Sequence, residues 1–446
     1  MRKVVKFGGS SLADSKQFEK VGNIISADES RLYVVPSAPG KRFSKDTKVT
    51  DMLIKAYEIT VEGGDLGEQL KKIKARYDEI IDGLGLELTL DDEFATIKEN
   101  LEKDPYLDYA SSRGEYLNGK VLANYLGFEF IDPYETIFFN EEGQLNDYKT
   151  NKVLKKRLEE AEHAVIPGFY GQGKDGRVKT FSRGGSDVTG SIVAAAAGVD
   201  VYENWTDVSG FLVADPRIVE DPETISTITY RELRELSYMG ASVLHEEAIF
   251  PVRSKGIPIN IRNTNRPQDE GTWIVESTAK KPAYTITGVA GKKGFCSITI
   301  TQALMNSQIG FGRSVLQAFE ESNISFEHMP SGIDTLSVVV HEDEFLLKEQ
   351  EVVARLHRMT EPDSIEIESD LALIAVVGRG MKSQSGTAAR LFAALANANV
   401  NIRMIDQGSS ELNIIIGVAN NDFEAAIRAI YENFVACVKA VRRTER

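Results

Sequence analysis

A lysine, two glycines and two serines follow one another near the start of the chain. Lys6 ends an apolar, strand-like run, and Gly8, Gly9, Ser10 and Ser11 come shortly after it. Because glycine has no Cβ, its backbone N–H can turn towards a bound anion, which a nearby ammonium group can neutralise. The segment predicts a phosphate cradle between a strand and a helix, with the serines as caps. The spacing excludes the P-loop motif, and a plain strand-to-helix turn with a solvated lysine stays an alternative on this segment alone.

A second group of the same kind lies in the middle of the chain. Arg183 precedes two glycines, Ser186 and Asp187 follow, and small residues then predict a helix over 188–197. A guanidinium suits bidentate capture of a carboxylate or phosphate, and Asp187 can accept an ammonium or orient a cation. The alternative is that Ser186 or Asp187 caps the helix and pairs with Arg183. That arrangement does not need both glycines, so anion binding is favoured.

Further polar residues fall at predicted loops and helix starts. Ser37 follows an apolar strand-like run, in the kind of loop where ligands collect at the edge of a parallel sheet. Thr50 is placed to cap a helix, and this is its simpler interpretation from the residues alone. Glu115 is expected at the start of a helix, where a carboxylate also interacts favourably with the helix dipole. Thr206, Asp207 and Arg217 offer a hydroxyl, a carboxylate and a cation for a nucleotide's ribose and phosphates.

Strand-like and helical segments alternate up to about residue 265, which predicts an α/β sheet with these groups at its strand ends. Residues 53–127 are helical in pattern and are expected to form an insertion that covers the sheet. Such a sheet would bind a nucleotide and an amino-acid-sized anion together.

Composition narrows the class of protein. The chain has 446 residues, enough for about three domains, and its net charge of −15 argues against a nucleic-acid partner. The first apolar run stops at Lys6 and no run reaches eighteen apolar residues, so we expect neither a signal peptide nor a membrane span but a cytoplasmic protein. The scattered histidines and the distant Cys296 and Cys437 predict no metal site and no disulfide, with both thiols buried and inert.

The last third of the chain is an internal repeat. Gly310 matches Gly386, 76 residues further on, and the offset holds without a gap to Val338 and Ile414. Each copy reads strand, glycine turn, helix, strand, turn, strand. Since neither copy gathers an acid, a base or a nucleophile, we interpret the repeat as a binding or pairing unit whose helix N-termini suit an amino-acid effector.

With VVKFGGSS, SRGGSD, WTDVSG and ADPR in place, the whole chain resembles a monofunctional, lysine-responsive aspartate kinase. The resemblance implies a three-layer αβα sandwich with a mainly parallel sheet over 1–282, the amino-acid-kinase domain. It further implies two ferredoxin-like βαββ modules of the ACT type, at about 283–365 and 366–446.

The resemblance also implies a reaction. ATP with Mg²⁺ would phosphorylate the β-carboxylate of L-aspartate to 4-phospho-L-aspartate, the first step towards lysine, threonine and methionine. Lysine, alone or with threonine, would inhibit through the ACT region, and the protein would be a homodimer or a dimer of dimers.

Matching residues take their expected roles from this resemblance. Lys6 would hold the transferring phosphoryl group, Asp187 would orient Lys6, and Arg183 would bind the substrate α-carboxylate. The other substrate-binding positions are Glu115 for the ammonium group, together with Ser37, Thr50 and Ser186. The nucleotide positions are Lys6, Phe7, Gly8, Gly9, Ser10, Thr206, Asp207, Leu212 and Arg217, and the effector positions are Met305, Gln308, Gly310, Phe311, Ser325, Phe326 and Glu327.

Two positions depart from the family pattern. Many relatives have an aromatic residue at Leu212 and a lysine at Ser242, so the grip on the nucleotide is expected to differ here. Two other functions stay open: another amino-acid kinase acting on glutamate or N-acetylglutamate, and a non-catalytic amino-acid sensor, for which Ser242 is the hint. For Glu327, a solvated strand charge stays the alternative to a contact with the lysine ammonium.

Overall fold

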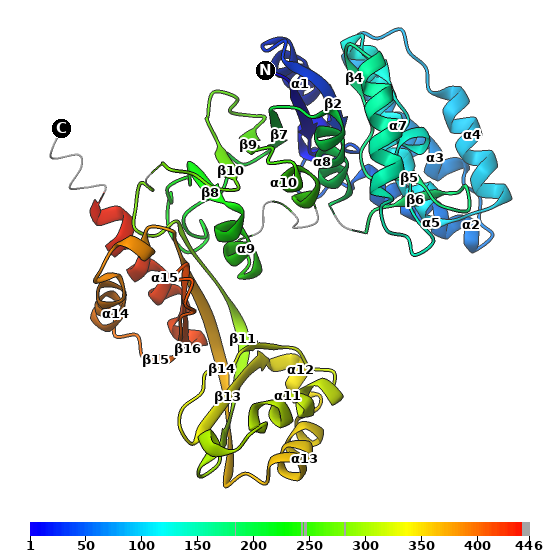
Figure 1. Ribbon diagram of the computed structural model, residues 1–446. Helices are drawn as coiled ribbons and strands as arrows, with labels where there is room; N and C mark the ends of the chain where they lie inside the picture. The colour runs from blue at the N-terminus through cyan, green and yellow to red at the C-terminus, as the bar shows by residue number, and fades with distance from the viewer. Residues whose placement is uncertain (183, 242–243, 245–247, 281, 439–446) are drawn as a thin grey trace. The chain divides into compact units, whose positions relative to one another are not determined.

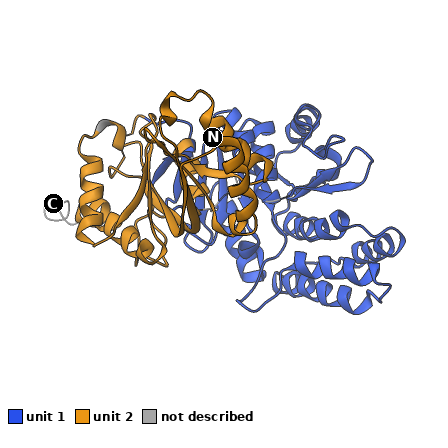
Figure 2. Ribbon diagram, turned by 90° about the horizontal axis from the view of Figure 1, so that it is seen from below, with its two compact units in different colours: residues 1–211, 226–230, 243–278 blue, residues 212–225, 231–242, 279–446 orange. Residues whose placement is uncertain are grey.

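A computed structural model describes residues 1–438 except 183, 242–243, 245–247 and 281. Two compact units share the chain (Figure 2). The first contains residues 1–211, 226–230 and 243–278, and the second contains 212–225, 231–242 and 279–446. Residues 212–225 and 231–242, which precede the C-terminal region in the sequence, therefore group with it. The predicted domain limits stay a prediction.

The first unit is built on an eight-stranded sheet. In spatial order its strands are β3 (Glu129–Phe130), β4 (Ala164–Val165), β2 (Arg31–Pro36), β1 (Lys3–Phe7), β7 (Val201–Thr206), β9 (Ile259–Asn263), β10 (Thr272–Val275) and β8 (Thr227–Thr229). Every neighbouring pair is parallel except β9 with β10. The expected mainly parallel sheet is therefore confirmed.

Helices cover both faces of this sheet and make it a three-layer sandwich (Figure 1). Val5 and Phe7 of β1 pack in one apolar cluster with residues of α1 (Ser15–Ser26) and α5 (Leu107–Leu126). Side chains alternate along a strand, so Lys6 faces the other layer, where α8 (Gly185–Ala197) contacts β1, β2 and β7. The remaining elements of this unit are α2 (Val49–Val61), α3 (Gly67–Gly83), α4 (Asp91–Lys103), α6 (Pro133–Thr136), α7 (Asp147–Glu160), α10 (Phe250–Ser254) and the hairpin of β5 (Tyr170–Gln172) and β6 (Val178–Thr180).

The second unit holds a six-stranded antiparallel sheet. Its order is β12 (Phe326–His328), β13 (Thr335–His341), β11 (Gly288–Thr301), β14 (Ser364–Val377), β16 (Asn413–Ala419) and β15 (Ile402–Asp406). Its helices are α11 (Phe311–Glu321), α12 (Glu342–Leu346), α13 (Glu349–Thr360), α14 (Thr387–Asn397) and α15 (Phe423–Tyr431), and most of α9 (Tyr230–Tyr238) also belongs to this unit.

The internal repeat is confirmed down to single backbone angles. Helices α11 and α14 keep the predicted offset, and each follows a glycine in the left-handed region, Gly310 at φ 87° and Gly386 at φ 83°. Asn323 and Asn399, which match each other, are also left-handed, at φ 51° and 55°. Both copies therefore use the same turns, although their sequences differ.

Each copy has more structure than the repeat pattern predicts. Strands β11 and β14 pair along their whole lengths (Figure 1), but only Phe295–Thr301 of β11 pairs with β13 and only Leu371–Val377 of β14 pairs with β16. The positive φ angles of Gly294 and Asp370 mark where each strand passes from one copy to the other. Each copy thus has four strands, the fourth contributed by the other copy, and further helices after the third strand, α12 and α13 in the first copy and α15 in the second.

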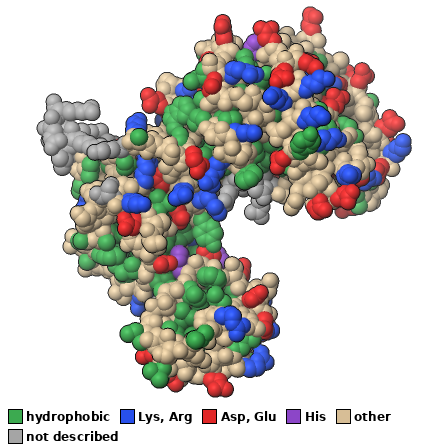
Figure 3. Space-filling view, in the orientation of Figure 1, with side chains coloured by type: hydrophobic (Ala, Val, Ile, Leu, Met, Phe, Trp, Pro, Cys, Tyr) green, Lys and Arg blue, Asp and Glu red, His purple; other side chains and the backbone are tan. Residues whose placement is uncertain are grey.

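Several expectations about the chain as a whole can be compared with the structure. Cys296 is buried as expected, but Cys437 is exposed, so the prediction of a buried thiol is wrong there. Within the described part of the chain, no helix is both long and apolar enough to cross a membrane. On the face drawn in Figure 3, Lys and Arg side chains of the described residues are interspersed with Asp and Glu side chains.

Candidate active site

Lys6 lies near the end of a central strand and pairs with a carboxylate from another element. Strand β1 lies between β2 and β7, where Lys6 is in register with Val35 and Asn204. Lys6 is 7 % exposed, and its Nζ lies 2.5 Å from Oδ1 of Asp187. The amide of Asn204 donates to the same oxygen at 2.8 Å. The structure therefore brings Lys6 and Asp187 together, and Asn204, which the sequence analysis did not single out, fixes the carboxylate.

Two glycine loops cross beside Lys6. The amide of Gly40 donates to the carbonyl of Gly9 at 2.8 Å, and a Cβ on Gly40 would lie 2.6 Å from the carbonyl carbon of Gly9. A side chain at either position would break this crossing. The amide of Gly8 donates to the carbonyl of Trp205, so it does not face an anion as predicted. The amides of Gly9 and Ser10 make no hydrogen bond with another described residue and stay available for a ligand.

The serines of this segment do not cap the first helix. Asp14 caps α1 instead, because its side chain accepts the amide of Gln17. Ser11 is buried, and its hydroxyl lies 2.7 Å from that of Thr264. The capping prediction for Ser10 and Ser11 is therefore wrong, and the Ser11 hydroxyl instead connects the loop to Thr264, directly after β9.

Glu115 is a buried carboxylate with one unsatisfied oxygen. It lies in the middle of α5, so the expected position in a first helical turn is wrong and the helix dipole does not explain it. Burial raises the pKa of Glu115 to about 7, against the lowering effects of the Ala38 amide and the charge of Lys6. Its Oε2 has no hydrogen-bond partner among the described residues. Buried polar atoms are normally paired, so this oxygen suits a ligand's ammonium group.

Asn118, one turn after Glu115 on α5, positions the loop that follows β2. Its amide donates to the carbonyl of Ser37 at 2.6 Å, and its own Oδ1 is buried without a described partner. A polar pair spaced three residues apart on a buried helix was the signal that could have revealed it. Thr50 lies inside α2, whose N-cap is Lys48, so its predicted capping role is wrong.

The first turn of α8 carries the second predicted group. Its N-cap is Gly184 at φ 56°, without a side-chain cap, which excludes the capping alternative for Ser186 and Asp187. A Cβ on Gly168 would lie 2.5 Å from Oγ of Ser186, so the loop after β4 lies directly against this turn. Arg183, predicted to bind the substrate carboxylate, lies outside the described residues.

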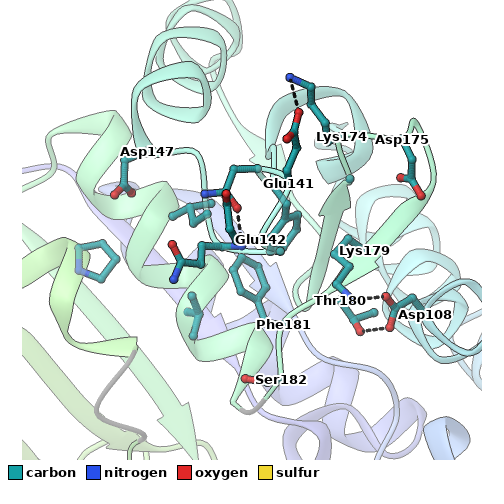
Figure 4. A pocket seen from close by; sticks show the side chains of 18 of the residues that line it. Asp108, Glu141, Glu142, Asp147, Lys174, Asp175, Lys179, Thr180, Phe181 and Ser182 are labelled. Carbon is teal, nitrogen blue, oxygen red and sulfur yellow. Dashed lines mark hydrogen bonds and ion pairs between the residues drawn. The ribbon is translucent and has the colours of Figure 1, made fainter.

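A cavity of about 1300 Å³ opens beside the same turn (Figure 4). Ser182 and Val188, which flank the turn, are among its lining residues. Asp108 on its wall accepts hydrogen bonds from Thr180 at 2.7 Å and lies 3.0 Å from Lys179. Lys6 is not among the residues that line this cavity.

The predicted nucleotide residues fall in both units. Thr206 and Asp207 end β7 in the first unit, where the Thr206 hydroxyl donates to Asp207 at 3.3 Å. Leu212 and Arg217 belong to the second unit, and the 87 % exposed Arg217 side chain pairs with Asp215. Ser242 lies outside the described residues.

The loop that carries Leu212 and Arg217 is tied to the second copy of the repeat. Val213 accepts the amide of Val289 on β11 at 2.7 Å, and the amide of Glu223 donates to the Tyr431 hydroxyl on α15 at 3.0 Å. Leu212 and Arg217 thus belong to the same compact unit as the internal repeat.

The predicted effector residues cluster in the first copy of the repeat. Met305 and Phe311 are in its core, whereas Gln308, Gly310, Ser325 and Phe326 are exposed. The carboxylate of Glu327 is largely covered, lies 3.3 Å from Nε2 of His341 and accepts a hydrogen bond from Tyr238. A solvated strand charge is therefore excluded for Glu327.

Comparisons with family models, known sequences and solved structures agree with one another. Residues 1–263 match the model of the amino acid kinase family, and residues 374–434 match an ACT domain. Aspartokinase 3 of Bacillus subtilis is 42% identical over 98% of this chain and 99% of its own length. The crystal structure of Clostridium acetobutylicum aspartate kinase superposes with a TM-score of 0.89 at 52% identity, covering 97% of this chain and 99% of that one. Aspartokinase III of E. coli, crystallised with lysine and aspartate, has a TM-score of 0.73 at 25% identity over 97% of this chain and 99% of that one.

Proposed function

Because the chain belongs to the amino acid kinase family, as an aspartate kinase with ACT modules, we propose that it transfers the γ-phosphoryl group of ATP to the β-carboxylate of L-aspartate. The product is 4-phospho-L-aspartate, which opens the route to lysine, threonine and methionine. The observation that carries this proposal is the buried Lys6 beside the crossing of Gly9 and Gly40, paired with Asp187, whose carboxylate also accepts the Asn204 amide.

The reaction needs positioning more than proton transfer. A free carboxylate has a pKa of about 4 and is ionised at neutral pH, so no general base is required. The barrier lies in bringing two anions together, which buried cations and free amides reduce. The ammonium of Lys6 and the amides of Gly9 and Ser10 meet this need for the phosphoryl group. Mg²⁺ would arrive with ATP and neutralise phosphate charge. The described residues form no group of three His, Cys, Asp or Glu side chains that could hold a metal ion.

Glu115 is the proposed partner of the aspartate ammonium group. Its unsatisfied Oε2 and its contact with Ala38 place a carboxylate next to the loop of Ser37. Arg183 would bind the α-carboxylate, with Ser186 and Thr50 beside the substrate. These roles follow the family pattern, to which the burial of Glu115 adds independent support.

Lysine is the proposed inhibitor, acting at the first copy of the repeat. The matched positions of the two copies differ in a way that supports this. In the second copy, Gln384 accepts a hydrogen bond from Thr285 at 2.7 Å, whereas the exposed Gln308 side chain makes none with another described residue. The covered carboxylate of Glu327 provides a partner for a lysine ammonium. The E. coli relative, crystallised with lysine, supports the same choice.

A homodimer or a dimer of dimers is proposed from the edges of the six-stranded sheet. Strands β12 and β15 end the sheet, and apolar side chains are exposed on both, Phe326 at 44% and Ile405 at 48%. Ile309, which precedes α11, is also fully exposed. Unpaired strand edges with apolar side chains favour pairing with a second copy.

A coupled assay for ADP tests the proposal. We expect turnover with L-aspartate, a product that hydroxylamine traps as a hydroxamate, and much slower turnover with L-glutamate or N-acetyl-L-glutamate. Absence of turnover with every amino acid would favour the sensor instead. Titrating lysine, threonine and both together into the same assay then identifies the inhibitor.

A further inference from the structure

A second, smaller cavity of about 480 Å³ lies in the first unit. Helices α4 and α5, the loop before α6 and the hairpin of β5 and β6 form its walls, and neither Lys6 nor Glu115 lines it. The cavity is therefore separate from the site proposed for phosphoryl transfer, and an inference about it does not depend on that function.

Arg113 forms part of the wall and is caged by aromatic rings. Its residue is 7 % exposed, and its guanidinium carbon lies 4.7, 4.6 and 5.1 Å from the ring centres of Tyr109, Tyr116 and Tyr170. Ring faces attract a cation, but each contributes only about 0.5–2 kcal/mol. The cage lowers the cost of burying the charge without neutralising it.

No described carboxylate lies within ion-pair distance of Arg113. Its Nε and Nη2 donate to the hydroxyl of Ser112, and Nη1 has no described acceptor. Of the other two lining cations, Arg177 pairs with Asp104, and Lys103 is exposed to solvent. A cation this deeply buried normally has a counter-ion, so the open Nη1 indicates that a ligand supplies one.

The other charges of the cavity define that ligand. The charged lining residues are Lys103, Asp104, Arg113, Asp132 and Arg177, which leave one positive charge in excess. Asp132 is already committed, because it accepts the Tyr170 hydroxyl at 2.8 Å and the Tyr134 amide at 2.9 Å. A single negative charge therefore balances the cavity, and tyrosine rings on its walls suit a flat or apolar body.

We infer that this cavity binds a small monocarboxylate, with the carboxylate on Nη1 of Arg113 and the body of the ligand against the tyrosine rings. A phosphate dianion fits less well, because it would exceed the positive charge and face Asp104 and Asp132.

Calorimetric titration of the full-length protein with benzoate tests the inference, in the presence of saturating L-aspartate so that the active site is filled. We expect saturable binding of one benzoate per chain, no measurable binding of the neutral isostere benzamide, and weaker binding of inorganic phosphate. Saturable benzamide binding with equal affinity, phosphate binding more tightly than benzoate, or no benzoate binding would each overturn the inference.

Two variants with the same change of charge localise the site. Arg113→Met keeps the length of the side chain and should weaken benzoate binding at least about tenfold, as expected for losing a charged hydrogen bond. Lys103→Met removes an exposed lining charge and should change the affinity less than about twofold. If both variants lost the same benzoate affinity, only the overall positive charge of the cavity would matter, and the inference would be overturned. Circular dichroism verifies the folding of both, and if Arg113→Met does not fold, Arg113→Lys with the comparison of benzoate and benzamide decides.

Discussion

Lys6 and Arg113 are both buried cations of the first unit, and their surroundings differ in kind. Lys6 has a carboxylate at 2.5 Å, provided by a helix more than a hundred residues away in sequence. Arg113 has three tyrosine rings, two of them from its own helix at positions 109 and 116. One cation is positioned by long-range pairing, the other by neighbours one turn away. An ion pair therefore fixes a charge at one point, whereas a ring cage retains a charge and leaves it open to a ligand.

The largest expected effect comes from removing the paired cation. Lys6→Met should lower kcat by about 10³-fold or more, because charge that develops on the transferring group loses its nearest counter-charge. Lysine binding to the second unit should persist, which equilibrium dialysis can measure. Retained turnover would contradict the role of Lys6.

Lys3→Met is the matched control for this experiment. Lys3 lies on the same strand and pairs with Asp28 at 2.7 Å and with Glu203 at 3.0 Å, away from the glycine loops. The same charge is lost from the same strand, so thermal stability should fall while kcat stays within about threefold. A comparable loss of kcat in both variants would mean that the net charge of the strand, rather than its position, matters.

A smaller effect is expected when the partner of Lys6 loses its charge but keeps its shape. Asp187→Asn still offers an oxygen to Asn204, so the loop should stay in place. The ammonium of Lys6 is then less firmly held, and we expect kcat to fall about 10- to 100-fold with little change in the KM for aspartate. A rise in KM without a fall in kcat would assign Asp187 to substrate binding instead.

Local patterns predicted the parts of the fold that depend on near neighbours. The strand before Lys6, the alternation of strands and helices and the offset of Gly310 and Gly386 follow from patterns along the chain, whereas the mainly parallel sheet was implied by the family resemblance. The strands that each copy contributes to the other do not follow from such patterns, because pairing between β11 and β14 joins segments whose own sequences carry no sign of each other. A repeat compares two copies but does not show which strand pairs with which.

The candidate site divides in the same way. Residue types identified Lys6 and Asp187 as candidates, but the position of Glu115 in mid-helix and the bond from Gly8 to Trp205 depend on tertiary contacts. Asn204 was missed because an asparagine within an apolar strand has no distinct pattern. The Tyr109, Arg113 and Tyr116 spacing was visible in the sequence, yet only the burial shows that it forms a cage.

As pH rises, ionisation of Glu115 should lower the stability of the folded protein and strengthen the binding of aspartate. Its pKa is raised from 4.5 to about 7 in the folded protein, so the folded state binds more protons than the unfolded state between these values. Stability should therefore fall as pH rises from about 4.5 to 7, by roughly 3 kcal/mol at most from this group. Ionised Glu115 attracts an ammonium group, so the KM for aspartate should fall over the same range.

Glu115→Gln isolates this contribution. Between pH 5 and 7, the thermal stability of the variant should fall less than that of the wild type. The KM of the variant for aspartate should be higher than that of the wild type and nearly independent of pH. Unfolding followed by circular dichroism and initial rates at the same pH values measure both. A wild-type KM that rises with pH would contradict the assignment of the ammonium group to Glu115.

Arg113→Met should have the smallest catalytic effect, although it removes the same charge as Lys6→Met. The charge of Arg113 lowers the pKa of Glu115, so its loss should move the midpoint of the KM profile to higher pH. We expect kcat to change less than about threefold, since Arg113 lines the separate cavity rather than the Lys6 site. Saturating benzoate should move the wild-type midpoint in the same direction and leave the variant unchanged, because the bound anion offsets a charge that the variant lacks. A shift of the KM midpoint to lower pH in Arg113→Met would contradict this difference between Lys6 and Arg113. Arg113 would then act on the active site by direct contact rather than through its charge.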